Sequence, residues 1–192
     1  MKNIHIELKG VTPLIMHSCQ SVNPLNPITK QMKTLTGKRK KTEGDLTALS
    51  DLEWEAGLYW DDKIGLYIPA ENMEATVREG AKARKKGKDI VRAFNCNEML
   101  IPLDIGEDLT KEQLRSDYRF RDVRAMKVMR ARVMRTRPRF NMWRCEFSVR
   151  YDESALDLQT ITDALDYAGR YVGLCDSRPK YGKFVAIVTE LD

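Results

Sequence analysis

The chain has 192 residues, 42% of them hydrophobic and 32% charged, and its formal net charge is +5. This length fits one domain with room for an inserted subdomain, and the hydrophobic fraction is sufficient for a packed core. No window of about 18 apolar residues occurs, so no membrane span is expected. The first six residues alternate like a strand and lack the apolar core of a signal peptide, so we expect a cytoplasmic protein.

The N-terminal segment predicts one strand followed by a loop. Residues 3–10 alternate apolar and polar side chains, which is typical of a strand with one face in the core. Residues 18–44 hold two Asn-Pro pairs, two glycines and the basic run Lys38, Arg39, Lys40 and Lys41, but no periodic apolar residues. They predict a long, basic, mobile loop, and loops of more than about 15 residues are usually functional or disordered.

The middle of the chain predicts a helix, a hairpin and a second helix. Residues 45–56 predict the first helix, and the apolar runs on either side of 61–65 predict a β-hairpin. The second helix covers about 70–86, has acids in its first turns and ends at Gly87. Its last turn gathers four cations at one end: Lys82, Arg84, Lys85 and Lys86.

The second half of the chain predicts strands at 98–105, 143–151 and 184–191, helices at 108–116 and 155–171, and an extended ribbon at 119–139. With the hairpin and the ribbon set aside, the element order is β, α, β, β, α, β. That is the ferredoxin-like (RRM-like) pattern, an antiparallel sheet with two helices on one face. The predicted fold class is therefore α+β, a single domain over 1–192 with insertions at about 18–69 and 106–140.

Positive charge is concentrated between Arg115 and Arg150, where eleven arginines and one lysine stand against three carboxylates. On an extended backbone, arginines two residues apart project from one face at a spacing of about 6–7 Å. That spacing is close to the spacing of phosphates along a single strand. The candidate phosphate-binding residues are Arg119, Arg121, Arg130, Arg132, Arg135, Arg137 and Arg139. The alternative is a solvated edge strand whose charges prevent aggregation.

A second candidate is the glycine-containing loop that joins the last helix to the last strand. Gly173 and Gly182 allow a ligand to approach the backbone closely. The loop also supplies charge and aromatic rings able to stack on a base: Arg178, Lys180, Lys183, Tyr181 and Phe184. The alternative is an ordinary helix cap and loop, and the Gly-Lys-Ser/Thr of a Walker A loop is missing.

Residues for catalysis or metal binding are few. His17 is a conceivable general base, although a lone histidine is more often structural. The four cysteines are far apart in sequence and form no C-x-x-C motif, so we expect reduced thiols and not a zinc site. The sequence predicts no cofactor and no metal ion.

The order βαββαβ, followed by a loop with Gly173, Arg178, Lys180 and Gly182, resembles the RAMP superfamily of CRISPR proteins. Members of that family have an RRM-like core and a C-terminal glycine-rich loop that touches RNA. The backbone subunits of class 1 effector complexes are the most similar, and they carry basic insertions and polymerise along a guide RNA. In some of them a loop aspartate near the first strand supports metal-dependent cleavage, but this sequence has no Asp between Met1 and Lys41.

The sequence therefore favours a non-enzymatic protein that binds single-stranded nucleic acid, RNA before DNA, through the phosphate backbone. The implied partners are the strand itself, further copies in a homo-oligomer or filament, and other subunits of a nucleoprotein complex, with no membrane. One alternative is a metal-independent endoribonuclease of the RAMP type with His17 as the base. The other is an interaction protein or inhibitor that docks on a nucleoprotein complex.

Overall fold

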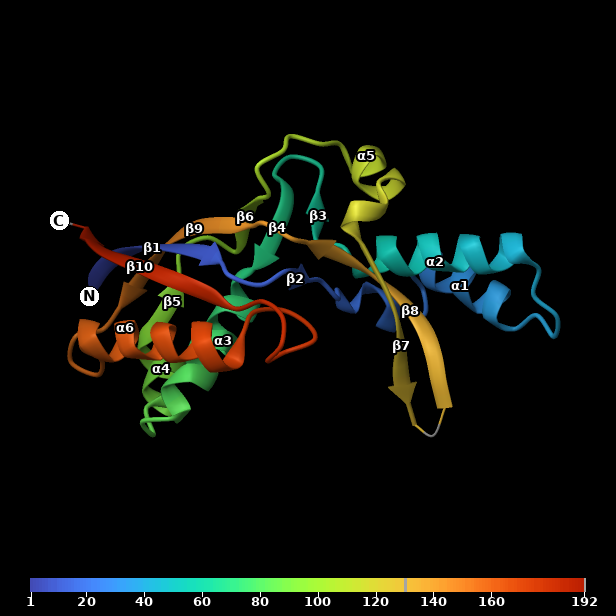
Figure 1. Ribbon diagram of the computed structural model, residues 1–192. Helices are drawn as coiled ribbons and strands as arrows, with labels where there is room; N and C mark the ends of the chain where they lie inside the picture. The colour runs from blue at the N-terminus through green and yellow to red at the C-terminus, as the bar shows by residue number, and fades with distance from the viewer. Residues whose placement is uncertain (130, 192) are drawn as a thin grey trace. The chain divides into compact units, whose positions relative to one another are not determined.

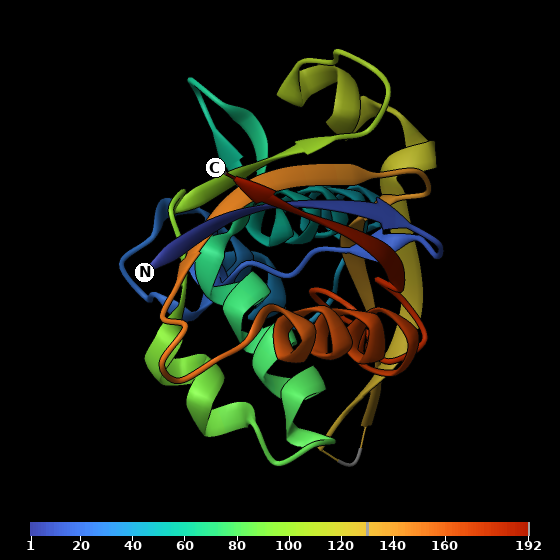
Figure 2. The same cartoon turned by 90° about the vertical axis from the view of Figure 1, so that its left-hand side faces the viewer.

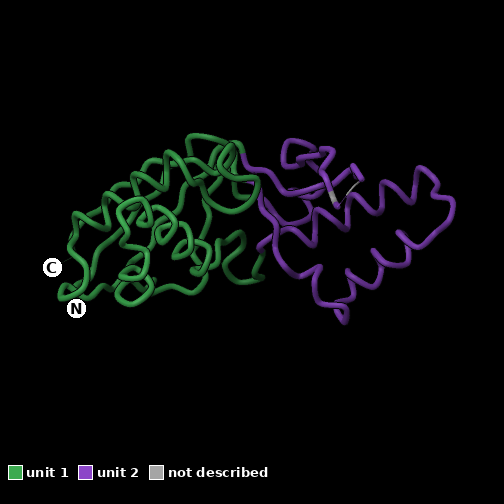
Figure 3. Tube along the Cα trace, turned by 90° about the horizontal axis from the view of Figure 1, so that it is seen from below, with its two compact units in different colours: residues 1–14, 60–108, 141–192 green, residues 15–59, 109–140 purple. Residues whose placement is uncertain are grey.

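The computed structural model has a mixed α+β architecture and describes residues 1–129 and 131–191 (Figure 1). The chain divides into two compact units (Figure 3). Unit 1 comprises residues 1–14, 60–108 and 141–192, and unit 2 comprises residues 15–59 and 109–140. Each unit is therefore assembled from segments that lie far apart in the sequence.

Unit 1 is built on an antiparallel sheet, in which Ile6 lies opposite both Phe147 and Val188. The sheet confirms the predicted hairpin and the strands predicted at 3–10, 98–105, 143–151 and 184–191. In spatial order the strands are β10 (Phe184–Leu191), β1 (Lys2–Gly10), β9 (Arg144–Tyr151), β6 (Leu100–Asp104), β4 (Gly65–Pro69) and β3 (Trp60–Asp61), and β5 (Phe94–Cys96) also pairs with β9. This arrangement is compatible with an RRM-like fold.

Helices α3 (Ala70–Lys82) and α6 (Leu158–Tyr167) lie on one face of the unit 1 sheet (Figure 1; Figure 2). A π-helical turn, η3 (Ala168–Val172), extends α6, and α4 (Gly87–Ala93) packs beside α3. The covered face carries the fully buried side chains of the alternating strands, such as Ile4 and Ile6. Burial of each such side chain contributes about 1.5–3 kcal/mol, so this layer holds the core of unit 1.

The prediction of a helix over 70–86 is confirmed as far as Lys82 and is wrong in its last turn. Helix α3 ends at Lys82, and Gly87 begins α4 instead of ending α3. Lys85 turns the chain between the two helices with a φ of 63°, in the left-handed region. Lysine rarely adopts that conformation, and glycine or asparagine usually occupies such a position. The sequence therefore does not mark the break between the two helices at residue 85.

Unit 2 combines a pair of helices with a two-stranded arm, which we define as β7 (Arg121–Val128) and β8 (Ala131–Phe140). Helices α1 (Pro27–Thr36) and α2 (Glu43–Gly57) pack side by side, and the hairpin of β7 and β8 confirms the predicted ribbon (Figure 1). The smaller elements are β2 (Leu14–Ile15), which lies beside β8, η1 (Cys19–Val22), α5 (Lys111–Ser116) and the 3₁₀ turn η2 (Tyr118–Phe120).

The base of the arm is fixed to α2 by a small core. The fully buried indole of Trp54 donates a hydrogen bond to the carbonyl of Phe120 at 2.8 Å. The rings of Phe120 and Phe140 then pack with their centroids 5.8 Å apart. These contacts hold the ends of β7 and β8 together against the helix, because a buried indole N–H needs an acceptor and finds it there.

The prediction of a mobile loop over 18–44 is wrong, because the segment contains η1, α1 and the start of α2. The side chain of Asn26 accepts a hydrogen bond from Ile28 N at 2.9 Å and caps α1, with Pro27 in its first position. An Asn-Pro pair is therefore a helix start here. Only Thr29 of α1 is buried, so the helix shows no apolar period in the sequence.

Candidate nucleic-acid interface

The arginines of the arm do not form one row. The strand alternation places Arg135, Arg137 and Arg139 on one face of β8, with Arg124 of β7 opposite Arg135. Arg132 faces the other way, as does Arg121 of β7, which lies opposite Pro138. The arm therefore carries cations on both faces, and the face with Arg135, Arg137 and Arg139 also carries Arg124 and Asp122 of β7.

Two of the predicted arginines are held by acids at the base of the arm. Arg119 lies in η2 and contacts Asp117 at 2.8 Å. Arg121 has a side chain only 9% exposed, lies 2.6 Å from Asp51 and donates to the carbonyl of Arg115. The buried contacts of Arg121 give it a structural role, whereas the side chain of Arg119 remains 60% exposed and its predicted role stays a prediction. Arg130, also predicted to bind phosphate, lies outside the described residues.

Arg135 and Arg137 differ in how their charge is balanced. Nη1 of Arg135 lies 2.5 Å from Glu53, whose other oxygen accepts a hydrogen bond from Thr136 N at 2.9 Å. Arg137 is half-buried, and burial together with the neighbouring guanidinium groups lowers its pKa, although Asp122 opposes this. An arginine stays protonated at neutral pH even so. The cluster therefore concentrates positive charge that an anionic ligand would relieve.

Arg135 and Arg137 line a hollow of about 440 Å³ between α1, α2 and β8, which we call the basic hollow. Its other polar lining includes Lys33 and Thr29 from α1, His17 from the segment after β2, and Glu53 from α2. Three cations and one carboxylate therefore line the hollow, and the carboxylate of Glu53 offsets the charge of Arg135. Cations around a concave surface focus the field on a bound anion.

His17 lies at this hollow with its surface still exposed. Desolvation of the ring lowers the pKa of His17, and the charges of Arg137 and Arg135 lower it further, against a smaller opposing effect of Glu53. The imidazole is therefore neutral at pH 7. A neutral imidazole next to cations is able to accept a proton or donate a hydrogen bond.

Sequence reasoning missed Lys33 and Thr29, because both fell in the expected loop. Thr29 and Lys33 are four residues apart and follow Pro27, a favoured first helical residue. This spacing is the signal that places both on one face of α1. The basic run Lys38–Lys41 joins α1 to α2. Within it Lys38 contacts Asp45 at 2.6 Å and lowers the pKa of that carboxyl, while Arg39 and Lys40 are exposed.

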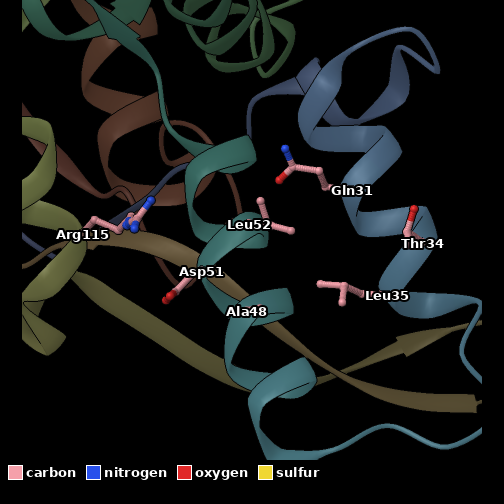
Figure 4. A pocket seen from close by; sticks show the side chains of 7 residues that line it. All are labelled: Gln31, Thr34, Leu35, Ala48, Asp51, Leu52 and Arg115. Carbon is pink, nitrogen blue, oxygen red and sulfur yellow. The ribbon is translucent and has the colours of Figure 1, made fainter.

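A second hollow of unit 2, also about 440 Å³, lies along α1 and α2 (Figure 4). Its lining includes the apolar side chains of Leu35 and Leu52, with Gln31 and Thr34 beside them. Arg115 is its one cation among the described lining residues and contacts Glu55 at 3.5 Å, while the lining carboxylate Asp51 pairs with Arg121. It is a mixed cleft and lacks the charge density of the basic hollow.

The glycine loop of unit 1 is tied to the segment after β1. Gly173 and Gly182 have φ values of 81° and 71°, and a Cβ at Gly182 would lie 2.0 Å from the carbonyl oxygen of Leu174. Gly182 N donates to Pro13 O at 2.9 Å, so the turn is closed by backbone hydrogen bonds. This close packing requires glycine at both positions, and their predicted contact with a ligand stays a prediction.

The charged side chains of the loop remain accessible. Arg178 and Lys180 are exposed, and the ammonium of Lys180 lies 5.8 Å from the ring centroid of Tyr181. Lys183 is partly exposed. Phe184, predicted to stack on a base, is buried and packs edge-on against Trp143, so that prediction is wrong.

The cations predicted at the end of a long helix are distributed around the turn between α3 and α4. Lys82 contacts Glu79 at 2.6 Å, and Lys86 contacts Asp89 at 3.2 Å. Arg84 pairs with Asp163 of α6. Within residues 1–129 and 131–191, no group of three or more His, Cys, Asp or Glu is placed to hold a metal ion, and no helix has the length and apolarity to cross a bilayer.

The fold, with its sheet-and-helix unit and basic second unit, is similar to a known structure. A chain described as "Cryo-EM structure of the Type III-B Cmr-beta bound to cognate target RNA" matches with a TM-score of 0.52 and 12% sequence identity. The match covers 98% of this chain and 61% of that chain, so it shows a shared fold over part of a longer protein. No protein-family model matches the sequence, and a search of curated proteins finds no match either.

Proposed function

We propose that this protein binds single-stranded nucleic acid, RNA in preference to DNA, along its phosphate backbone, as an RRM-like subunit of a CRISPR-type effector complex. The observation that carries the proposal is the basic hollow, where Lys33, Arg135 and Arg137 surround a concave surface with one compensated carboxylate. The similar solved chain is described as bound to target RNA, which supports RNA as the ligand.

The arm extends this surface beyond the hollow. Arg132 and Lys127 are exposed near its tip, together with Met129 and Met134, which are 90% and 61% exposed. Cations contact phosphates and apolar side chains contact base faces, so this composition fits a single strand better than a duplex. We further propose that the glycine loop and the run Lys38–Lys41 add backbone contacts.

The proposal is tested by the binding of a labelled RNA of about 30 nucleotides in rising salt. Single-strand binding releases about 0.7 counterions per neutralised phosphate. Because Glu53 offsets the charge of Arg135, the three cations of the basic hollow predict a contribution of about −1.4 to the log–log slope. Affinity that does not change with salt would contradict the proposal. A single-stranded DNA and a duplex of the same length serve as comparisons, and weaker binding of both is expected.

The assembly belongs to the same proposal. We propose that copies of the chain associate as a homo-oligomer along the strand or beside other subunits of a nucleoprotein complex. Light scattering of complexes with RNAs of about 15, 30 and 60 nucleotides measures this, because stepwise mass gain with length shows assembly along the strand. A constant one-to-one mass would contradict it.

A second candidate function rests on His17. Its neutral imidazole lies at the hollow with Arg135, Arg137 and Lys33, which is a base next to cations that stabilise a phosphorane. A metal-independent endoribonuclease uses such a group to deprotonate a ribose 2′-hydroxyl. Incubation of end-labelled RNA with wild type and with His17→Ala, both in chelator, tests it. Equal cleavage, or none, removes this candidate.

A further inference from the structure

Unit 1 carries a groove of its own between the end of α3 and α4, which we call the α3–α4 groove. It measures about 590 Å³, within the range of about 300–1,000 Å³ that is common for ligand sites. Its lining holds five cations, with Gly87 and the exposed Val91 between them: Arg78, Lys82, Lys85, Lys88 and Arg92.

The backbone explains why the groove forms. The left-handed turn at Lys85 reverses the chain, and Lys86 N donates to the carbonyl of Ala81 at 3.0 Å, so α4 returns against α3. Gly87 lets the helices approach, since a Cβ there would lie 2.9 Å from Cγ of Lys82 and 3.3 Å from the carbonyl oxygen of Arg78. The backbone therefore sets the close approach of the two helices, and long cationic side chains line the groove that results.

The charges of the groove are poorly compensated. Glu79 contacts Lys82 at 2.6 Å and Arg78 at 3.6 Å. Among the described residues, no ion pair is found for Lys85, Lys88 or Arg92. Nε of Arg78 is buried without a hydrogen-bond partner in the part of the chain that the structure describes. A buried donor without an acceptor is destabilising unless a ligand or solvent supplies one.

Two other cations of the same turn point to acids instead. Arg84 pairs with Asp163, and Lys86 pairs with Asp89. Neither residue lines the groove. Of the cations in this turn, Arg84 and Lys86 are therefore paired outside the groove, and Lys82 is paired with Glu79 within it. Lys85 lines the groove without an ion pair among the described residues.

We propose that the α3–α4 groove holds consecutive phosphate groups of a single-stranded nucleic acid, as a second contact in addition to the basic hollow of unit 2. This inference rests on the proposed function and adds Arg78, Lys88 and Arg92 to the binding residues. The lining contains no aromatic ring and no uncompensated carboxylate to recognise a base, so the contact reads the phosphates and not the sequence. Two anchored segments on one strand raise the local concentration of each for the other.

The test compares two double variants that remove the same charge from the same turn. Lys85→Gln/Lys88→Gln removes two cations without ion pairs from the groove, and Arg84→Gln/Lys86→Gln removes two cations that are paired with acids. Binding of an RNA of about 30 nucleotides is measured across a salt series, with circular dichroism and melting temperature to confirm the fold. We expect the groove variant to bind about tenfold more weakly with a slope shallower by about 1.4, and the matched variant to bind within about twofold of wild type.

The outcomes separate this inference from the function on which it rests. If the two double variants weaken binding equally, or if neither does while Arg137→Gln does, the groove proposal is overturned and the proposed function stands. If wild type shows no salt-dependent RNA binding, both fall. A poly-glutamate chain of matched charge is added as a competitor. If it lowers the apparent RNA affinity of wild type to that of the groove variant as efficiently as a single-stranded RNA competitor does, the groove binds acidic protein and the proposal is wrong.

Discussion

The carboxylate of Glu53 contacts Nη1 of Arg135 at 2.5 Å while its second oxygen accepts a hydrogen bond from Thr136 N at 2.9 Å. Glu53 is only 8% exposed, so the pair brings one end of α2 and the strand β8 together at the basic hollow. The carboxylate therefore has two effects: it fixes β8 against the helix, and it cancels one of the charges that would face a bound phosphate.

The first prediction concerns Glu53→Gln. The amide oxygen of Gln can still accept the hydrogen bond from Thr136 N, but the charge of Arg135 is no longer cancelled. We expect RNA affinity to rise several-fold, with a log–log salt slope steeper by about 0.7. The free energy of unfolding should fall by about 1 kcal/mol, a modest loss because Arg135 remains partly exposed.

Glu55→Gln is the matched control for this prediction. Glu55 lies on the same helix and contacts Lys111 at 2.8 Å and Arg115 at 3.5 Å, and it does not line the basic hollow. Equal gains in affinity for the two variants would show a general effect of net charge, and the assignment of the hollow would then fail.

The second prediction separates two arginines that look equivalent in the sequence. Arg132 is exposed, and the described part of the chain offers it no ion pair. Arg132→Gln should leave the free energy of unfolding within about 0.5 kcal/mol of wild type and weaken RNA binding. Arg121→Gln leaves Asp51 without its partner, so we expect a loss of about 2 kcal/mol in stability and unchanged affinity of the folded protein. Urea unfolding and RNA titration measure both, and a reversed pattern would contradict the assignment.

The strands were predictable because buried apolar residues alternate with more exposed residues along them. Ile4, Ile6 and Leu8 of β1 face the helices, and Cys145, Phe147 and Val149 of β9 face the same layer, so a period of two appears in the sequence. The antiparallel sheet and the α+β class follow from local patterns of this kind.

The candidate site was only partly predictable because charge compensation is a tertiary property. The spacing of Arg121 and Arg135 is visible in the sequence, but their partners Asp51 and Glu53 lie on a helix about 70–80 residues away. The α3–α4 groove was hidden for a different reason. The turn at Lys85 uses a left-handed lysine in place of glycine, so the basic run appeared to continue one helix.

The third prediction concerns pH and His17. Desolvation and the charges of Arg137 and Arg135 hold the pKa of His17 below its unfolded value of about 6.5. Between the pKa of His17 in the folded chain and its value in the unfolded chain, the unfolded chain binds more protons. The contribution of His17 to the free energy of unfolding is therefore present above pH 6.5 and is lost as the pH falls. Bound phosphates have the opposite effect, since they raise the pKa of the imidazole and favour proton uptake.

RNA affinity should therefore increase as the pH falls from about 7.5 to 5.5, by more in wild type than in His17→Gln. Fluorescence anisotropy at constant ionic strength measures the affinity, and calorimetry in two buffers of different ionisation enthalpy counts the protons taken up. Parallel pH profiles for wild type and His17→Gln would show that His17 does not face the ligand.

The fourth prediction compares two glycines that both have a positive φ angle but differ in the atoms around them. Gly182 has a φ of 71°, and a Cβ there would lie 2.0 Å from the carbonyl oxygen of Leu174, whereas Gly106 has a φ of 78° and no atom within 4 Å of such a Cβ. Gly106→Ala should cost about 1 kcal/mol from backbone strain alone. Gly182→Ala adds displacement of a packed backbone, so we expect a loss of about 2–4 kcal/mol in the free energy of unfolding.

A variant that removes two exposed cations of the glycine loop tests what the loop contributes to RNA binding, with Gly106→Ala as the control. The backbone of the loop is closed by the hydrogen bond from Gly182 N to Pro13 O and by the one from Leu174 N to Gly182 O. We therefore expect its exposed Arg178 and Lys180 to be the groups that contact a phosphate. Gly106→Ala should bind RNA as wild type does. Arg178→Gln/Lys180→Gln should weaken RNA binding and keep the wild-type stability in urea. A stability loss as large as that of Gly182→Ala would instead show that the two cations hold the loop together and do not contact the strand.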